Sequence, residues 1–401
     1  MGSHVTFDAN LVEAVTPPRP QRLLLAAALL HGDSMTAAWT EWRSLVDFDG
    51  DLLEPATMRL LPLVYHNLAA NGVQDPILGR LRGIHRRAWV NNQLQFAACA
   101  RLLRIFHAAG IKTLVLKGAA VVTQFYPDHG ARPMGDVDVL VPKRQAQAAL
   151  DLLTEHGWRP TRMPRSRMTP TFTSVRHAQN FAGPDGNNLD LHWHIFIDHL
   201  DEETDALLWE AAIPHSVQQV ATRRLNPTDQ LLHVCVHGMS LLLTPRVGWI
   251  ADAVMILRRA HATVDWTRLV ELATRSYNTL YLRAAFGYLR GSFTAPIPDH
   301  VLAALTAAPV APQEEALFRS FQKRDSIFGQ LPLLWNRYRL ARGRTSAGAG
   351  VFGFPGYLRI YHGKASLGEM AAWAASRARF RAGNFLHAQW QAWRAKQRPA
   401  R

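Results

Sequence analysis

The chain has 401 residues, 48% of them hydrophobic and 19% charged, and this balance excludes an intrinsically disordered protein, because so much apolar surface favours a folded core. The longest apolar run, residues 23–30, is too short to cross a bilayer, which takes about 20 residues. Two cysteines, Cys99 and Cys235, exclude a disulfide framework and a cysteine zinc site, so we expect a cytoplasmic protein without a transmembrane segment.

Positive charge is concentrated at the C-terminal end. The net charge of the whole chain is +14. Residues 319–401 contain 16 Lys and Arg against two acidic residues, which accounts for the entire excess. A basic segment of this kind can bind RNA, an acidic membrane surface or another polyanionic partner. It can equally be a solvated basic surface, and both readings stay open.

Residues 9–110 are predicted to be helical, because apolar side chains recur there at spacings of three and four. The period then changes, and short β-branched runs alternate with helical ones. The pattern predicts, in order, a strand at 112–116, a helix at 118–126, a strand at 136–141, a helix at 144–156, a hairpin pair at 172–175 and 177–182, and a strand at 189–195.

Helical spacing returns from residue 227 onward. The predicted helices are 229–237, 249–259, 266–276, 280–289, 369–381 and 385–396, with a Gly-rich loop over 345–356. The fold class is therefore α+β, with a small mixed β-sheet flanked by N-terminal and C-terminal helical regions. We expect four regions: a helical region 1–110, an α/β core 111–225, a helical domain 226–318 and a basic helical tail 319–401.

The strongest chemical signal is the pair Asp136-x-Asp138 in an apolar strand. Residues two apart in a strand share a face, so the two carboxylates lie together. Such a pair is unfavourable unless a cation neutralises it. Mg²⁺ suits oxygen ligands and commonly binds one or two carboxylates plus substrate phosphates. The alternative is a pair of acids that merely solvates an edge strand.

Two further features fit the same chemistry. Asp190 supplies a third carboxylate in another alternating strand. Lys117-Gly118 joins the first strand to a helix, where free backbone N–H groups at a helix N-terminus form a natural phosphate cradle. Three carboxylates and a phosphate cradle in a small sheet point to two-metal phosphoryl or nucleotidyl transfer.

The motifs together resemble a known family. They are residues 114–120, 125–126, 132–141 and 189–193, supported by 91–110, 233–238 and 249–252. This set resembles the uncharacterised nucleotidyltransferase family proteins, a group within the DNA polymerase β-like nucleotidyltransferase superfamily. The resemblance covers roughly residues 40 to 290, and it rests on the ordered set, since an Asp-x-Asp alone is a weak signal.

The resemblance implies that Asp136 and Asp138 hold two Mg²⁺ ions and that Asp190 completes the metal site and helps to activate an acceptor hydroxyl. Gly118 would let the backbone approach the triphosphate of an NTP, with ATP as the first donor to consider. One departure matters. The superfamily usually has Gly-Ser after the first strand, whereas this chain has Lys117-Gly118, and Asp136 follows Gly118 by 18 positions. Lys117 could replace the serine as a phosphate contact.

Several other residues are secondary candidates. Arg132 could bind a nucleotide phosphate or equally anchor its loop through a salt bridge. His192 and His194 share a face with Asp190 if the strand is regular, and either could border the site, although a structural histidine is the commoner case. His233 and His237 lie at i, i+4 on a helix, where we expect packing rather than a zinc site.

The sequence leaves three functions open. The first is a metal-dependent nucleotidyltransferase that moves a nucleotide to an acceptor hydroxyl and releases pyrophosphate, which the resemblance connects with tailoring of peptides or other natural products. The second is a non-catalytic nucleotide-binding module with a regulatory or antitoxin-like role. The third is a phosphotransferase on the same fold. The intact set of three acids favours an enzyme over the second reading.

Overall fold

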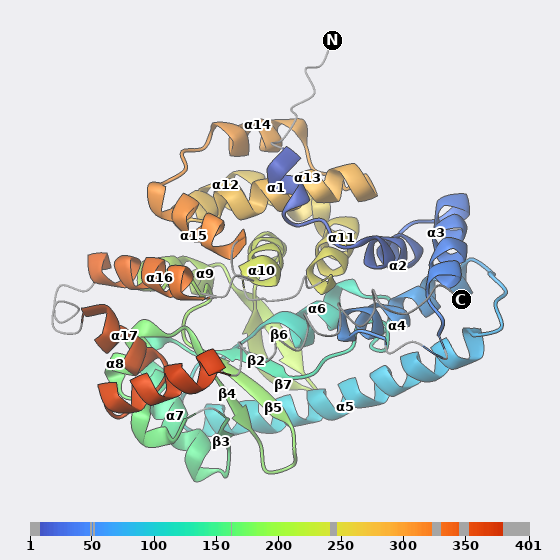
Figure 1. The fold of residues 1–401 in the computed structure, drawn as a ribbon. Coiled ribbons are helices and arrows are strands. Elements are labelled where there is room, and N and C mark those ends of the chain that lie inside the picture. The colour runs from blue at the N-terminus through green and yellow to red at the C-terminus, as the bar shows by residue number, and fades with distance from the viewer. Residues whose placement is uncertain are drawn as a thin grey trace.

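A mixed β-sheet surrounded by helices from both ends of the chain forms the centre of the protein (Figure 1). The computed structural model describes residues 9–48, 50, 53–161, 163–240, 247–322, 330–344 and 353–379. The predicted α+β class, with a mixed sheet and helical flanks, is confirmed. In these described ranges, the structure contains no helix with both the length and the apolar character needed to span a bilayer.

The N-terminal region is helical, as predicted. Asn67 joins two of its helices, because its side-chain amide donates to the carbonyls of Ala27 at 2.9 Å and Leu30 at 2.7 Å and so satisfies the end of α2. The helices are α1 (Ala9–Glu13), α2 (Arg19–Leu29), α3 (Gly32–Leu45), α4 (Pro55–Ala70) and α5 (Leu78–Ala108). The long helix α5 runs beneath the sheet in Figure 1.

Seven strands form the sheet in the order β3-β4-β5-β2-β1-β7-β6. Strand β2 pairs parallel with β5 and antiparallel with β1, and β1 pairs parallel with β7. The strands are β1 (Leu114–Val115), β2 (Val137–Leu140), β3 (Arg159–Pro160), β4 (Ala178–Ala182), β5 (Asn188–His192), β6 (Ile213–Val217) and β7 (Val220–Arg224). The helices between them are α6 (Lys117–Phe125), α7 (Ala146–Glu155), α8 (Pro170–Val175) and α9 (Glu202–Glu210), with 3-10 turns at Lys143–Gln145 and Arg165–Arg167.

The two faces of the sheet pack against different cores. Val137, Val139 and Leu191 belong to a core built with α5, α6 and α7. Leu140 lies on the opposite face and belongs to a larger core, built mainly from α2–α4 and the helices after residue 226. Because side chains alternate along a strand, Asp138 and Asp190 lie on this second face. The acids are thus covered by the helical region rather than by α5.

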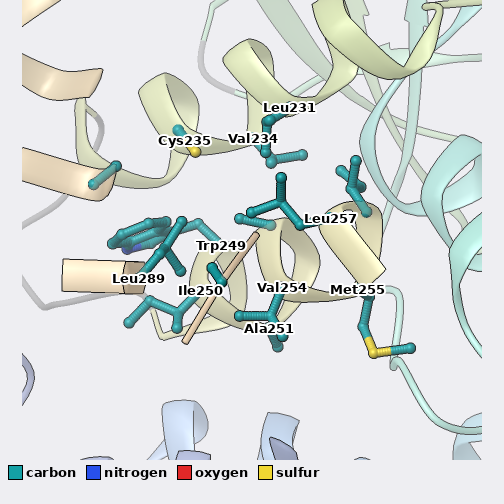
Figure 2. Close-up of a cluster of buried hydrophobic side chains, with 14 of the residues drawn as sticks. Leu231, Val234, Cys235, Trp249, Ile250, Ala251, Val254, Met255, Leu257 and Leu289 are labelled. Carbon is teal, nitrogen blue, oxygen red and sulfur yellow. The ribbon is translucent and has the colours of Figure 1, made fainter. Parts of the chain in front are cut away.

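The helices after the sheet pack closely on one another. Figure 2 shows Leu231, Val234 and Cys235 of one helix meeting Trp249 and Ile250 of the next, and all five side chains are buried. The helices are α10 (Pro227–Ser240), α11 (Gly248–Ala260), α12 (Trp266–Arg275), α13 (Thr279–Phe293), α14 (Asp299–Ala307), α15 (Pro312–Gln322), α16 (Leu331–Arg344) and α17 (Gly353–Tyr361), with a 3-10 turn at His261–Thr263 and a further helix over 367–379.

One sequence expectation about the sheet was wrong, and one hairpin of the sheet was missed. Residues 172–175, predicted as one arm of a hairpin, form helix α8, because Thr169 caps the helix by accepting from Phe172 N–H and Pro170 begins it. Strand β4 instead pairs with β5 across the turn at 183–187. The β6–β7 hairpin was not predicted. The Gly-rich loop is helical from Gly353, while its residues 345–352 and the predicted helix 385–396 lie outside the described residues.

Part of the basic C-terminal region is built into the fold. The side chain of Arg337 is 9% exposed and its Nε donates to Asp198 at 2.5 Å. The guanidinium of Arg176 lies 4.4 Å from the ring centre of Tyr361. On α16 and α17, the rings of Trp335, Tyr338 and other aromatic residues contact one another in tilted and edge-to-face arrangements. In the described part of this region, alternating aromatic and basic residues therefore contribute to packing.

Candidate active site

The end of β1 and the middle of β2 and β5 bring the acidic residues together. Asp138 and Asp190 are direct partners in the parallel β2–β5 pair, so their side chains emerge side by side on the same face. The N–H of Leu116 donates to the carbonyl of Asp138 at 3.0 Å. This bond places the next residue, Lys117, beside the two acids.

Lys117 begins α6 with a left-handed backbone, at φ 44°. Its Nζ donates to Asp138 Oδ1 at 2.5 Å and to Asp190 Oδ2 at 3.4 Å, and it lies 3.3 Å from His192 Nε2. His192 Nε2 in turn lies 3.0 Å from Asp190 Oδ2 and 3.3 Å from Asp138 Oδ1. One ammonium, one imidazole and two carboxylates thus form a compact, mostly buried cluster.

Opposite charges stabilise the charged forms in this cluster against the effect of burial. Burial alone raises the pKa of a carboxyl group, yet the charges of His192 and Lys117 hold the pKa of Asp190 well below its usual value. The pKa of Asp138 is lowered in the same way, chiefly by Lys117. Burial lowers the pKa of Lys117 and of His192, but the carboxylates outweigh it and both pKa values are raised.

Asp136 lies just before β2, outside the group of ligand atoms formed by Asp138, Asp190 and His192. Its pKa is raised to about 6, first by the charge of Asp138 and then by burial, while Lys117 opposes the shift. Arg59 of α4 also acts to lower this pKa, and Arg59 was not identified from the sequence. The three carboxylates therefore outnumber the two positively charged groups in contact with them, Lys117 and His192.

Arg132 is held in an ion pair on the loop that leads to β2. Its Nε and Nη2 donate to Asp252 of α11 at 2.6 and 2.7 Å, and the Tyr126 hydroxyl donates to the same carboxylate at 2.6 Å. This is the loop-anchoring salt bridge that the sequence left open. Gly118 lies next to this ion pair: a Cβ there would come within 2.9 Å of Met134 and 3.0 Å of Arg132 Nη1. Gly118 is thus needed for close packing here.

Three more histidines surround or flank the cluster. His194 Nδ1 lies 2.6 Å from Asp205 Oδ2 of α9 and forms a separate buried pair. His177 was not identified from the sequence, and its ring lies 5.4 Å from that of His192. His233 of α10 is fully buried, and neither ring nitrogen has a hydrogen-bond partner among the described residues. Burial, then the positive charges of Lys117 and His192, lower its pKa to about 3.

Comparison with family models matches residues 55–291 to a family described as uncharacterised nucleotidyltransferase. The chain belongs to this family. The match includes all seven strands, Lys117, the three acids and His192, and it confirms the resemblance identified from the sequence. No curated protein matches the chain. Transfer of a nucleotide is thus the chemistry to test in this nucleotidyltransferase family member.

The residues present fit a divalent metal ion. Asp138, Asp190 and His192 each offer one ligand atom, and the three atoms lie within 4.8 Å of one another. Two carboxylate oxygens suit Mg²⁺ or Mn²⁺, whereas the imidazole nitrogen of His192, which must lose its proton to bind a metal ion, favours Mn²⁺ and other transition metals over Mg²⁺. The position of Lys117 also shows that the site attracts a cation. His192 was expected only at the border, and its Nε2 lies between the two carboxylates.

Proposed function

We propose that this protein is a metal-dependent nucleotidyltransferase that moves a nucleotide from an NTP, with ATP as the first donor to test, to a hydroxyl group of an acceptor. The family supports nucleotide transfer. The observation that carries the proposal is the convergence of Asp138 and Asp190 on one face of paired strands, with an imidazole between them.

In the proposed reaction, the acceptor oxygen forms a bond to the α-phosphorus, the bond from that phosphorus to the bridging oxygen breaks, and pyrophosphate leaves. Asp138, Asp190 and Asp136 would hold two divalent ions, with Mg²⁺ as our proposal and Mn²⁺ as the first alternative. When bound, these ions would neutralise charge that develops on the phosphate oxygens. The hydroxyl proton would pass to Asp190, which is a weak base while Lys117 and His192 neutralise it.

The remaining assignments concern the nucleotide and the acceptor. The N–H groups at the start of α6, beside Lys117 and Gly118, can donate to phosphate oxygens. Arg132 lies next to the same helix start, because a Cβ on Gly118 would come within 3.0 Å of its guanidinium. We propose a hydroxyl-bearing peptide or related natural product as the first acceptor class to screen, because the sequence resemblance points there. A polyanionic partner for the basic C-terminal region, RNA or an acidic membrane surface, also stays a proposal.

The test uses ATP that is radiolabelled on either the α- or the γ-phosphate, with Mg²⁺ or Mn²⁺ and a pool of hydroxyl-bearing acceptors. Label that reaches an acceptor from the α position, together with pyrophosphate release, supports the proposal. Label transferred only from the γ position identifies a phosphotransferase and refutes it. Tight nucleotide binding without any transfer favours the non-catalytic module.

Variants sharpen this experiment. Asp138→Asn and Asp190→Asn should abolish transfer, because each removes a carboxylate from the proposed metal site. Asp185→Asn is the matched control, since Asp185 is an exposed acid that pairs with Arg101. Circular dichroism must show that all three variants are folded. Transfer that survives in either Asp138→Asn or Asp190→Asn would place the chemistry elsewhere.

A further inference from the structure

The ammonium of Lys117 lies among the same atoms that could hold a metal ion. It contacts Asp138 Oδ1 at 2.5 Å and Asp190 Oδ2 at 3.4 Å, and it lies 3.3 Å from His192 Nε2. Those three residues are the group whose ligand atoms lie within 4.8 Å of one another. A divalent ion bonded to the carboxylate oxygens at about 2.0–2.2 Å leaves no room for an ammonium at the same contacts.

We infer that Lys117 is a built-in cation that competes with the metal ion for this site and moves to the nucleotide phosphates when the metal ion binds. The inference rests on the proposed function for the second half of this exchange. Its first half, competition between the ammonium and a metal ion for Asp138 and Asp190, depends only on the cluster itself.

Three features make the exchange feasible. The three carboxylates of the cluster outnumber the ammonium of Lys117 and the imidazole of His192, so the cluster stays short of positive charge. The Lys117 side chain is 16% exposed, which gives it a route outward. Lys117 is also the first residue of α6, so its flexible side chain starts where the helix N-terminus can receive a phosphate.

The exchange couples two binding events. Without nucleotide, a metal ion that displaces Lys117 leaves a partly buried ammonium short of counter-charge, and this opposes metal binding. With nucleotide, the phosphates supply a new partner for the ammonium. Metal and nucleotide should therefore each strengthen binding of the other, as linkage requires. A metal ion that coordinates the phosphates also couples the two events, so it is the displacement of Lys117 by the metal ion, and not coupling alone, that distinguishes this exchange from a permanent structural salt bridge.

The test measures Mn²⁺ affinity by electron paramagnetic resonance of free Mn²⁺, without any turnover. Lys117→Met should bind Mn²⁺ about tenfold or more tightly than the wild type in the absence of nucleotide, which lies within the usual range of coupling between sites. Lys143→Met is the matched control, because Lys143 is a partly buried lysine that bonds Thr173 away from the cluster, and its variant should bind Mn²⁺ like the wild type. Equal or weaker Mn²⁺ binding by Lys117→Met overturns the inference.

A second measurement needs no variant and covers the case in which Lys117→Met does not fold. Mn²⁺ should speed acylation of Lys117 by an amine-reactive reagent, read by peptide mass spectrometry, with Lys143 as the internal control. Adding an ATP analogue with a methylene bridge between the α- and β-phosphates should slow it again. A Lys117 labelling rate that Mn²⁺ leaves unchanged also overturns the inference.

The outcomes separate this inference from the proposed function. If Mn²⁺ releases Lys117 but the analogue has no effect on either readout, the competition stands and the proposed nucleotide chemistry fails. If α-phosphate transfer is observed but Lys117→Met gains no affinity for Mn²⁺, the function stands and Lys117 is a structural ion pair.

Discussion

Removing the carboxylate of Asp252 should destabilise the fold by several kilocalories per mole. Asp252 is buried and accepts three hydrogen bonds, two from Arg132 and one from Tyr126. Breaking a buried ion pair by deleting one partner costs about 3–5 kcal/mol. The side chain of Arg132 is 20% exposed, so water can partly replace the lost contact, and we expect Asp252→Ala to cost about 3–4 kcal/mol.

A double-mutant cycle in urea checks this reasoning, with two spectroscopic probes to confirm that the transitions coincide. The variant Arg132→Met/Asp252→Ala buries no unpaired charge. We therefore expect its free energy of unfolding to be at least that of Asp252→Ala alone. Two results would refute the ion pair as the anchor of the loop. One is a loss of unfolding free energy below about 1 kcal/mol for Asp252→Ala, well under the usual cost of breaking a buried pair. The other is a double variant that is less stable than Asp252→Ala.

The same variants separate the two roles open to Arg132. If Arg132 only anchors the loop before Asp136, then Arg132→Met and Asp252→Ala should weaken ATP binding to a similar extent. If Arg132 also contacts a phosphate, Arg132→Met should weaken ATP binding further. Equilibrium titration with a fluorescent ATP analogue provides the measurement.

Three more predictions concern stability. The pKa of Glu314 is raised from 4.5 to about 7, mainly by burial. The folded chain thus holds this proton more tightly than the unfolded one, so the contribution of Glu314 to stability is fully present below pH 4.5 and is lost as the pH rises through about 7. Glu314→Gln should remove about 2–3 kcal/mol of that fall between pH 5 and pH 8 in urea unfolding, and an unchanged slope would contradict this. A Cβ on Gly238 would overlap the Cβ of Trp249, whose ring is drawn in Figure 2. Gly238→Ala should therefore lower the free energy of unfolding by about 3 kcal/mol or more. A loss under about 1 kcal/mol would show that α10 and α11 can separate easily. Arg337→Met leaves the carboxylate of Asp198, whose side chain is only 10% exposed, without this ion pair. Limited chymotrypsin digestion should therefore cut residues 330–379 faster than in the wild type, and equal rates would show that this pair does not hold the segment.

The acidic part of the site could be predicted from the sequence because strand alternation fixes which residues share a face. Asp138 and Asp190 stand in apolar strands, so their direction follows from their neighbours, and the structure places them side by side. The contact made by Lys117 could not be predicted, because it depends on a left-handed backbone at the first residue of α6. No spacing rule signals that conformation at a lysine.

The errors in the fold have similarly local causes. Phe172 to Val175 has the composition of a strand, but the preceding Thr169-Pro170 is a helix-start signal that outweighs it. The β6–β7 hairpin turns at Gln218 and Gln219, which both have positive φ, at 44° and 66°. Such turns usually carry Asn-Gly or similar residues, so a Gln-Gln pair gives no signal. His233 was noticed for its spacing to His237, whereas its burial near Lys117 depends on how α10 packs.

Both outer strands of the sheet contain a proline, Pro160 in β3 and Pro214 in β6. Hydrogen-bonded pairs alternate along a hairpin, and counting from the two-residue turn between Val217 and Val220 puts the backbone nitrogen of Pro214 on the side away from β7. Proline has no hydrogen there to offer an incoming chain. A proline in each edge strand thus disfavours the addition of a strand from another molecule. At high protein concentration this disfavours edge-to-edge association into fibrils.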